Sequence, residues 1–349
     1  MGKNRRRIRR RRRVHPCVAR CDAAEDHRPG PSGIRNRVHR RGLSRYVRRE
    51  RGVRARRVNP RRTARGAPSS VPRVTTPSPE SAARQPVDAA RLRAAVAGSL
   101  PLFDTVDVVD STGSTNADLI ARAAHTESTA VLVAEEQLAG RGRHARAWVS
   151  PPRAQISLSM LVRPNGIDPA VLGWLPLLTG VAVVDALRGA AGVDAELKWP
   201  NDVLIGGRKV AGILAEVAAG APNPAVVIGV GVNVTLSAAE LPVPHAISLL
   251  LAGASTLDRT ELILSLLTEF DRRFTAWRDA DWAVSEVVAA YRERCATLGA
   301  EVRAELPGGE VLTGVASDVD EHGRLVIGDR ALSAGDVTHL RAGYRVEGA

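Results

Sequence analysis

Residues 198–216 read KWPNDVLIGGRKVAGILAE and carry the strongest structural signal in this chain. Two apolar runs, 202–205 and 208–216, flank Gly206-Gly207, which is the composition of a tight turn between antiparallel strands. The segment therefore predicts a β-hairpin.

Lysine is rare in this sequence, and this hairpin region holds two of the three lysines, Lys198 and Lys209, among 50 basic residues. An ammonium is a compact charge that can approach a single oxygen, whereas a guanidinium is a wide planar fork. Asn201 and Asp202 add oxygen atoms that can coordinate a cation. A turn after Pro200 and a solvated strand edge would explain the same residues without function. Their combination in so short a segment favours a phosphate and metal site.

Upstream, small polar residues precede a helix that apolar spacing predicts at 117–123. Hydroxyl and amide side chains from Ser111 to Asn116 are typical of a helix N-cap. The exposed amides and hydroxyls of such a helix start can also bind a polar ligand. Both interpretations apply to this segment.

Residues 140–148, GRGRHARAW, form a glycine-hinged loop rich in arginine. Their G-x-G-x-x-A spacing matches a dinucleotide fingerprint, but that motif needs a following helix, which Pro151-Pro152 would interrupt. The glycines allow movement, the guanidiniums suit phosphate oxygens, and Trp148 offers a face for a base. A mobile surface turn has the same composition.

Apolar patterning predicts further elements on both sides of the hairpin. Strands are expected at 105–109, 130–134, 156–162 and 226–234, and helices at 92–96, 171–187, 260–279 and 282–296. Glycines at 229 and 231 mark places where a ligand or another backbone can come close. Short alternating runs at 302–306, 311–319, 325–327 and 331–340 predict a small β-barrel at the C-terminal end.

The net charge of +13 belongs to the N-terminal region. Residues 1–70 hold 25 Lys+Arg and 4 Asp+Glu, whereas the remainder holds the other 25 basic residues and 33 acidic residues. The first 82 residues lack apolar periodicity, so we expect a disordered extension. Its arginines can bind nucleic acid or anionic membrane, although Tyr46 is its only aromatic residue, and a solvated extension explains the same composition. The spacing of His15, Cys17, Cys21 and His27 is poor for zinc.

Composition excludes several classes of protein. No run reaches the roughly 18 apolar residues of a membrane helix, and no apolar segment follows the N-terminal arginines as in a secretory signal. Three cysteines are too few for a disulfide scaffold. We expect a cytoplasmic protein, and Cys295 in its core.

Taken together, these segments resemble the biotin–protein ligases. The matching motifs are Gly113-Ser114-Thr115-Asn116, the loop from Gly140 to Trp148, Lys198-Trp199-Pro200-Asn201-Asp202, and Lys209-Val210-Ala211-Gly212-Ile213-Leu214. The resemblance implies an α/β (α+β) fold, with a mixed-sheet catalytic domain followed by a small SH3-like β-barrel. It places the extension at residues 1–86, the catalytic domain at 87–296 and the barrel at 297–345.

The resemblance also implies roles for individual residues. The biotin-binding set is Ser114, Thr115, Asn116, Gln137, Arg141, Gly142, Arg143, Lys209 and Gly212. The ATP-binding set is Arg146, Trp148, Lys198, Asn201 and Asp202, with Asp202 also holding Mg²⁺. Lys209, Arg143 and Arg146 are the implied catalytic residues.

The implied reaction is activation of biotin by ATP and Mg²⁺ to biotinyl-5′-AMP, followed by transfer to a lysine of a biotin carboxyl-carrier domain. Acyl-CoA or pyruvate carboxylases are the expected partners, with no membrane and a monomer or weak homodimer. No winged-helix pattern appears in residues 1–86, so no specific operator DNA is expected. Ala145 replaces a glycine of the family loop, which would cost about 1 kcal/mol if that position needs a positive φ.

Two alternatives remain open from the residues alone. A lipoate–protein ligase has a similar fold, but it needs an apolar tunnel rather than the polar contacts of Ser114, Thr115, Asn116 and Gln137. A nucleic-acid-binding protein would act through the arginine-rich tail, and deletion of that tail would distinguish it from a ligase.

Overall fold

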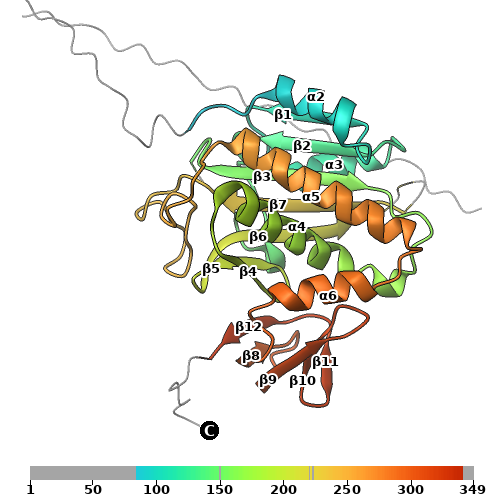
Figure 1. Ribbon diagram of the computed structural model, residues 1–349, viewed down its shortest axis with the longest axis vertical. Helices are drawn as coiled ribbons and strands as arrows, with labels where there is room; N and C mark the ends of the chain where they lie inside the picture. Colours follow the sequence, from blue (N-terminus) through green and yellow to red (C-terminus); the bar gives the residue numbers. More distant parts are fainter. Residues whose placement is uncertain (1–83, 149–150, 220, 222–223, 341–349) are drawn as a thin grey trace, which may run out of the picture. The chain divides into compact units, whose positions relative to one another are not determined.

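The computed structural model describes residues 84–148, 151–219, 221 and 224–340 (Figure 1). Contacts divide the chain into residues 1–71 and 72–349, and every described residue belongs to the second unit. The expectations for the arginine-rich tail, including its disorder and its histidine and cysteine residues, therefore fall almost entirely outside the described residues. Described contacts begin at Arg84, where the guanidinium pairs with Glu240 at 2.7 Å.

A seven-stranded mixed sheet forms the larger part of the described chain, as the fold prediction required. Its order is β1-β2-β3-β7-β6-β5-β4, and β1 pairs with β2 in parallel while the other neighbouring pairs are antiparallel. The strands are β1 (Thr105–Val109), β2 (Ala130–Ala134), β3 (Gln155–Val162), β4 (Ala195–Lys198), β5 (Asp202–Ile205), β6 (Arg208–Val217) and β7 (Val226–Asn233). β2 and β3 are buried along their whole length. β2 is a continuous apolar run, whereas β3 also buries Gln155, Ser157 and Ser159.

Helices cover both faces of this sheet. One face packs against α2 (Ala89–Ser99), α4 (Trp174–Ala191) and α5 (Arg259–Asp279), with α6 (Ser285–Arg294) beside α4 (Figure 1). The opposite face carries α3 (Thr115–Ala123), whose Leu119 packs on Leu132, Leu161 and Val227. The site described below lies on the α3 face.

α4 is long and apolar enough to cross a membrane by length and composition alone, yet 72% of that window is buried within the structure. The helix begins at Trp174, three residues after its expected start, because Pro169–Val171 form a separate 3₁₀ turn capped by Asp168. α4 is the central helix of the core.

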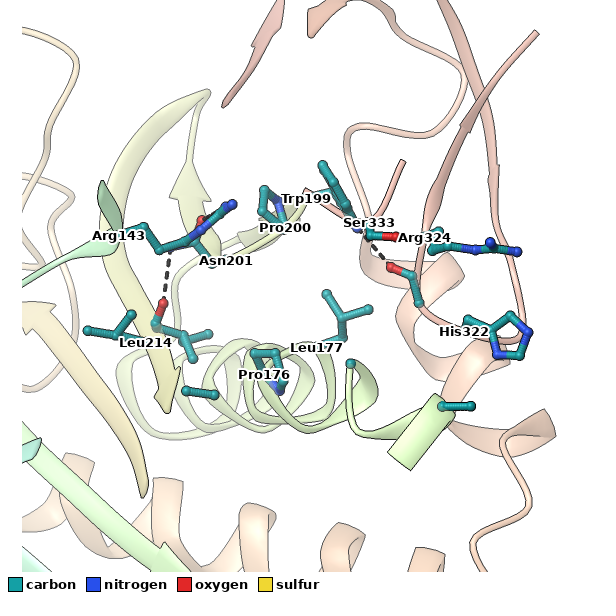
Figure 2. A pocket seen from close by; sticks show the side chains of 15 residues that line it. Arg143, Pro176, Leu177, Trp199, Pro200, Asn201, Leu214, His322, Arg324 and Ser333 are labelled. Carbon is teal, nitrogen blue, oxygen red and sulfur yellow. Dashed lines mark hydrogen bonds between the residues drawn. The ribbon is translucent and has the colours of Figure 1, made fainter. Parts of the chain in front are cut away.

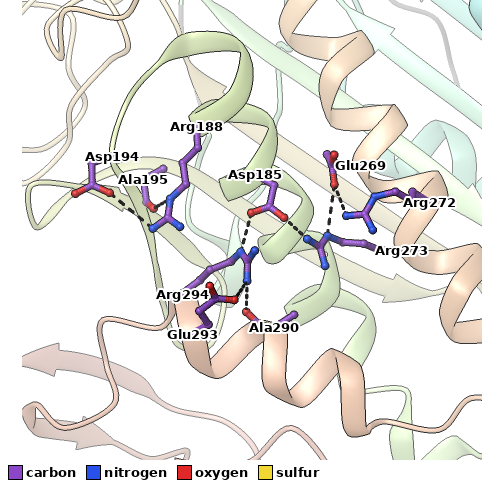
Figure 3. A network of polar contacts seen from close by, with 10 residues as sticks. All are labelled: Asp185, Arg188, Asp194, Ala195, Glu269, Arg272, Arg273, Ala290, Glu293 and Arg294. Carbon is purple, nitrogen blue, oxygen red and sulfur yellow. Dashed lines mark hydrogen bonds and ion pairs between the residues drawn. The ribbon is translucent and has the colours of Figure 1, made fainter.

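Ion pairs join α4, α5 and α6 at the surface of this layer (Figure 3). Asp185 of α4 accepts from Arg294 of α6 at 2.7 Å and also pairs with Arg273 of α5. Because these side chains are only 14–18% exposed, the pairs are screened less than ordinary surface pairs. They fix the helical layer against which the sheet is held.

The C-terminal part is a five-stranded antiparallel sheet in the order β11-β10-β9-β8-β12. Its strands are β8 (Glu301–Glu305), β9 (Val311–Val319), β10 (Leu325–Ile327), β11 (Arg330–Leu332) and β12 (Asp336–His339). The single expected run at 331–340 is thus two strands. Nε1 of Trp174 donates to the Glu321 carbonyl at 2.8 Å, and Nε1 of Trp199 donates to the Gly323 carbonyl at 3.1 Å. These bonds hold the β9–β10 turn against the larger sheet.

The predicted hairpin is confirmed as β5 and β6. Gly206 and Gly207 have φ values of 55° and 73°, the left-handed conformation that a tight turn of this kind requires. A bulge between Val203 and Leu204 shifts the register, so Asp202 faces Gly212 and Leu204 faces Lys209. This register places the KWPND motif beside the strand that carries the second lysine.

Candidate active site

Two glycines of β7, Gly229 and Gly231, and Gly212 of β6 beside them form a surface without side chains on the α3 face of the sheet, here called the glycine floor. Gly229 faces Ser159 of β3 and Leu214 of β6, while Gly231 faces Ser157 and Gly212. Because side chains alternate along a strand, these two rows lie on the same face. The missing side chains of Gly229 and Gly231 leave room for the side chains of Asn116 and Trp148, respectively, whereas the sequence led us to expect a ligand or another backbone there.

Asn116 occupies the space above Gly229. A Cβ at position 229 would lie 2.3 Å from Asn116 Oδ1, which is closer than real Cβ contacts. The amide nitrogen of Asn116 donates to Glu216 at 2.7 Å and to the Leu214 carbonyl at 3.2 Å. Its oxygen lies 2.6 Å from Ser159 Oγ. Asn116 is 7% exposed, and protein groups use both of its amide hydrogens.

Thr115 and Gln137 continue this polar group toward the end of β2. Gln137 Oε1 accepts from the Thr115 backbone N–H at 2.9 Å and lies 3.0 Å from the Thr115 hydroxyl. Ser114 caps α3 through a longer contact, 3.5 Å to the Ala117 N–H. The structure therefore brings together four residues of the biotin-binding set, Ser114, Thr115, Asn116 and Gln137, and Ser114 also has the N-cap role.

Trp148 lies above Gly231 and Gly212. Its Cε2 atom would be 2.4 Å from a Cβ at position 231, and Lys209 Nζ lies 5.7 Å from the centroid of the indole. Such a separation is within the range of a cation–π contact. Two residues assigned to different ligands, Trp148 for ATP and Lys209 for biotin, thus meet on the glycine floor.

Lys209 forms an ion pair with Asp202. The Nζ–Oδ1 distance is 2.5 Å, and the two side chains are 25% and 19% exposed. The position of Lys209 is fixed by its backbone, since its N–H donates to the His245 carbonyl and its carbonyl accepts from the Ile247 N–H. An ammonium and a carboxylate are thereby placed together at the edge of the glycine floor.

The arginine loop folds back on itself between Gly140 and Trp148. Trp148 N–H donates to the Gly140 carbonyl at 2.8 Å, and Gly142 N–H donates to the Arg146 carbonyl at 2.7 Å. A Cβ at position 140 would lie 2.4 Å from the Trp148 carbonyl oxygen, so this close approach requires glycine. Arg141 pairs with Ala147 in an isolated bridge. The loop is a closed turn rather than the start of a helix, which confirms the rejection of the dinucleotide motif.

Arg143 reaches from this loop to the KWPND motif. Its Nη1 donates to Asn201 Oδ1 at 3.1 Å, while the Asn201 amide donates to the Ile213 carbonyl at 3.0 Å. Burial lowers the pKa of Arg143 from its usual value, and the negative charges of Asp202 and Asp336 oppose this. The guanidinium stays charged, and it is partly desolvated beside the hairpin.

Arg146 turns toward the C-terminal sheet, where it pairs with Asp336 of β12. Burial opposes ionisation of Asp336, but the hydrogen bond from Arg146 and the charges of Arg146, Lys198 and Arg143 lower its pKa. Asp336 is thus stabilised as a carboxylate by cations of both the arginine loop and the KWPND motif. The sequence reasoning missed it, because nothing in the spacing of β12 connects it with a loop 190 residues away.

In this loop His144 has the left-handed conformation, with φ of 55°. Any strain from the left-handed conformation falls on histidine, one of the residue types that adopt it more readily.

A cavity of about 560 Å³ adjoins the site (Figure 2). It lies between the start of α4, residues 213–215 of β6 and the β9–β10 turn, where His322 and Arg324 are found. Arg143 and Asn201 line it, so it opens beside the two residues that connect the loop with the hairpin.

A resident metal centre is not indicated. In the described part of the chain, no cluster of three or more histidine, cysteine or acidic side chains could hold an ion. Asp202 supplies one carboxylate, and Asn201 uses its amide oxygen for Arg143. This donor set fits a magnesium ion that arrives bound to substrate phosphates, because Mg²⁺ typically takes one or two carboxylates together with phosphate oxygens.

Comparison with known sequences gives this arrangement a family. Residues 106–233 match the Biotin/lipoate A/B protein ligase family, and residues 297–340 match the Biotin protein ligase C terminal domain. The biotin–[acetyl-CoA-carboxylase] ligase of Mycobacterium tuberculosis is 46% identical over 267 residues, which cover 74% of this chain and 97% of the relative.

The chain belongs to the biotin protein ligase family. The bifunctional ligase/repressor BirA of Bacillus subtilis is 33% identical over 63% of this chain and 67% of the relative. A solved biotin protein ligase from Aquifex aeolicus, in complex with biotin and ATP, has a TM-score of 0.57 at 26% identity and covers 68% of this chain and all of that structure. The resemblance drawn from the motifs, including the C-terminal domain, is confirmed.

Proposed function

We propose that this protein is an ATP-dependent biotin–protein ligase. It activates the carboxylate of biotin to biotinyl-5′-AMP with release of diphosphate, and then transfers the biotinyl group to a lysine amine of a carrier domain, with release of AMP. The relatives support this reaction. The name of one combines biotin with acetyl-CoA-carboxylase, and the solved structure of another contains biotin and ATP.

One observation carries this proposal. The ammonium of Lys209 lies over the glycine floor, 3.2 Å from where a Cβ of residue 212 would be, and it is held beside Asp202. The polar group of Asn116 and Thr115 lies at one end of that floor, and the arginine loop lies at the other. A ligand with a polar ring at one end and a carboxylate at the other would bring its carboxylate to Lys209.

The chemistry requires positive charge at this point. A carboxylate that attacks the α-phosphate of ATP brings several negative charges together, and Lys209, Arg143 and Arg146 can stabilise them without forming a covalent bond. Asp202, with Asn201 beside it, would hold a magnesium ion that arrives with ATP, and this ion would help to neutralise the phosphate charge. No nucleophile from the protein is needed, since the acceptor amine attacks the acyl carbon directly.

Biotinyl-AMP is a mixed anhydride, so water must be excluded until the acceptor lysine arrives. The loop from Gly140 to Trp148 is suited to this task because Trp148 lies on the floor and Arg143 contacts the hairpin through Asn201. Arg141 and Gly142 contribute as members of this loop. Lys198 acts on the nucleotide side, where its charge acts on Asp336 and His339.

The finer assignments extend this proposal. We place the protein in the cytoplasm, with the carrier domains of acyl-CoA or pyruvate carboxylases as acceptors, and with no membrane partner. We also propose that it binds no specific operator DNA and acts as a monomer or weak homodimer. Selectivity for biotin over lipoate follows from the hydrogen-bonding side chains above Gly229.

The deciding experiment measures ATP–diphosphate exchange with the full chain and either biotin or lipoate, followed by transfer to a purified biotin carrier domain. We expect exchange with biotin, little with lipoate, and labelling of the carrier lysine. Exchange supported by lipoate but not by biotin would overturn the assignment.

A further inference from the structure

Glu216 is the residue of the site that neither the motifs nor the family resemblance assigned. It lies near the end of β6, one row beyond Leu214, and faces Val227 of β7. Its carboxylate accepts from the Asn116 amide at 2.7 Å. The side chain therefore acts on the ring end of the site through another residue.

The contacts around Asn116 impose one orientation on its amide. Both partners of Nδ2, the Glu216 carboxylate and the Leu214 carbonyl, can only accept hydrogen bonds. The amide oxygen must then face Ser159, whose hydroxyl lies 2.6 Å away. Because an amide oxygen only accepts, Ser159 must use its single proton for this bond.

The same logic makes the next hydroxyl a donor with two possible acceptors. Thr115 Oγ1 lies 2.7 Å from Ser159 Oγ. Because the Ser159 proton is donated to Asn116, Ser159 Oγ can only accept here. Thr115 can donate to Ser159 or to Gln137 Oε1, at 3.0 Å. The donors and acceptors that this group presents to a bound ring thus depend on the carboxylate at its far end.

We propose that Glu216 is a positioning residue for the ring of biotin: its carboxylate fixes the amide orientation of Asn116 and thereby the direction of the Ser159 hydroxyl proton, which leaves Thr115 as a donor toward Ser159 or Gln137. This inference rests on the proposed function, since it takes biotin as the ligand. A ureido ring is recognised by the pattern of hydrogen-bond donors and acceptors that faces it. The Glu216 carboxylate, which only accepts, determines that pattern.

Glu216→Gln tests this role because it keeps the shape of the side chain but replaces an obligatory acceptor with a group that can also donate. We expect the KM for biotin in diphosphate release to rise about tenfold, the difference between a charged and a neutral partner. The KM for ATP and kcat should stay within twofold. Glu286→Gln, which removes the same charge from the exposed start of α6, is the matched control and should change neither KM.

A reciprocal exchange separates positioning from a general structural role. In Asn116→Asp combined with Glu216→Gln, the new amide donates to the new carboxylate, whose second oxygen again accepts from Ser159. We expect the biotin KM to recover toward wild type relative to Glu216→Gln, although the bond to Leu214 is lost.

Three outcomes would overturn the inference: a biotin KM unchanged by Glu216→Gln, biotin and ATP KM values that rise together, or a double variant weaker than the single one. If the wild-type chain did not activate biotin at all, the proposed function would fail instead. The wild-type arm of the assay therefore keeps the two conclusions apart.

Discussion

Replacing Lys209 with alanine should reduce both the adenylation rate and the stability of the fold, for reasons that can be separated. The ammonium lies 2.5 Å from Asp202. Removing one partner of a fully buried ion pair costs about 3–5 kcal/mol, because the other charge is left unpaired. Here the side chains are 25% and 19% exposed, so we expect about 1–2 kcal/mol, a fall in Tm of about 3–6 °C.

The catalytic effect is expected to be larger. Loss of one group aimed at developing negative charge typically costs about 10²–10³-fold in rate. Lys209→Arg should rescue poorly, since a guanidinium fork does not reproduce a compact charge at one oxygen. Asp202→Asn added to Lys209→Ala should restore most of the lost Tm, because no unpaired carboxylate remains, but it should not restore the rate.

The assay is biotin-dependent diphosphate release under single-turnover conditions, with thermal unfolding measured on the same samples. Near-normal adenylation by Lys209→Ala would remove this residue from the mechanism. Recovery of rate together with Tm in the double variant would mean that Lys209 acts only by neutralising Asp202.

Three further outcomes are expected. Gly229→Ala should raise the biotin KM at least tenfold and lower Tm, since its Cβ would lie 2.3 Å from the Asn116 amide oxygen. Gly189→Ala, in the last turn of α4 with nothing within 4 Å of the new Cβ, is the control and should stabilise the fold by up to about 1 kcal/mol. The Arg84 hydrogen bond, and then the Ser237 backbone N–H, lower the pKa of Glu240 from 4.5 to about 2. The stabilisation that results is complete above about pH 4.5 and is lost as pH falls toward 2. In urea unfolding, Arg84→Ala should therefore reduce the fall in the free energy of unfolding between these pH values, by no more than about 1 kcal/mol. Deleting residues 1–82 spares Arg84 and should leave transfer activity and Tm unchanged, and a Tm loss above 3 °C would contradict this.

The elements with strong local signals were predictable from the sequence. β1, β2, β9 and β10 have the expected bounds, and the hairpin turn at Gly206-Gly207 was correct because positive φ leaves few other residue choices. Helix starts were less accurate, since Pro169 creates a separate turn before α4. Propensity alone does not show where one turn ends and the next helix begins.

The site shows the same division between local and distant information. Ser114, Thr115 and Asn116 could be found because a helix start leaves a local sequence pattern. Glu216 and Asp336 could not, because each acts through a partner about 100 residues away or more, chosen by sheet register and by packing of the C-terminal sheet. The spacing of residues along the sequence does not show which distant side chains the fold brings into contact.

The glycine floor has a spectroscopic consequence. Of the five tryptophans in the chain, Trp174, Trp199, Trp277 and Trp282 are at most 7% exposed and pack in the core. Of these five, Trp148 alone lies over Gly212 and Gly231, so a ligand that binds on this floor, as proposed for the adenylate, would displace or restack its indole. A change in intrinsic emission on titration with biotin or nucleotide would therefore report on Trp148, together with Trp199 where the ligand enters the neighbouring cavity, without any added label.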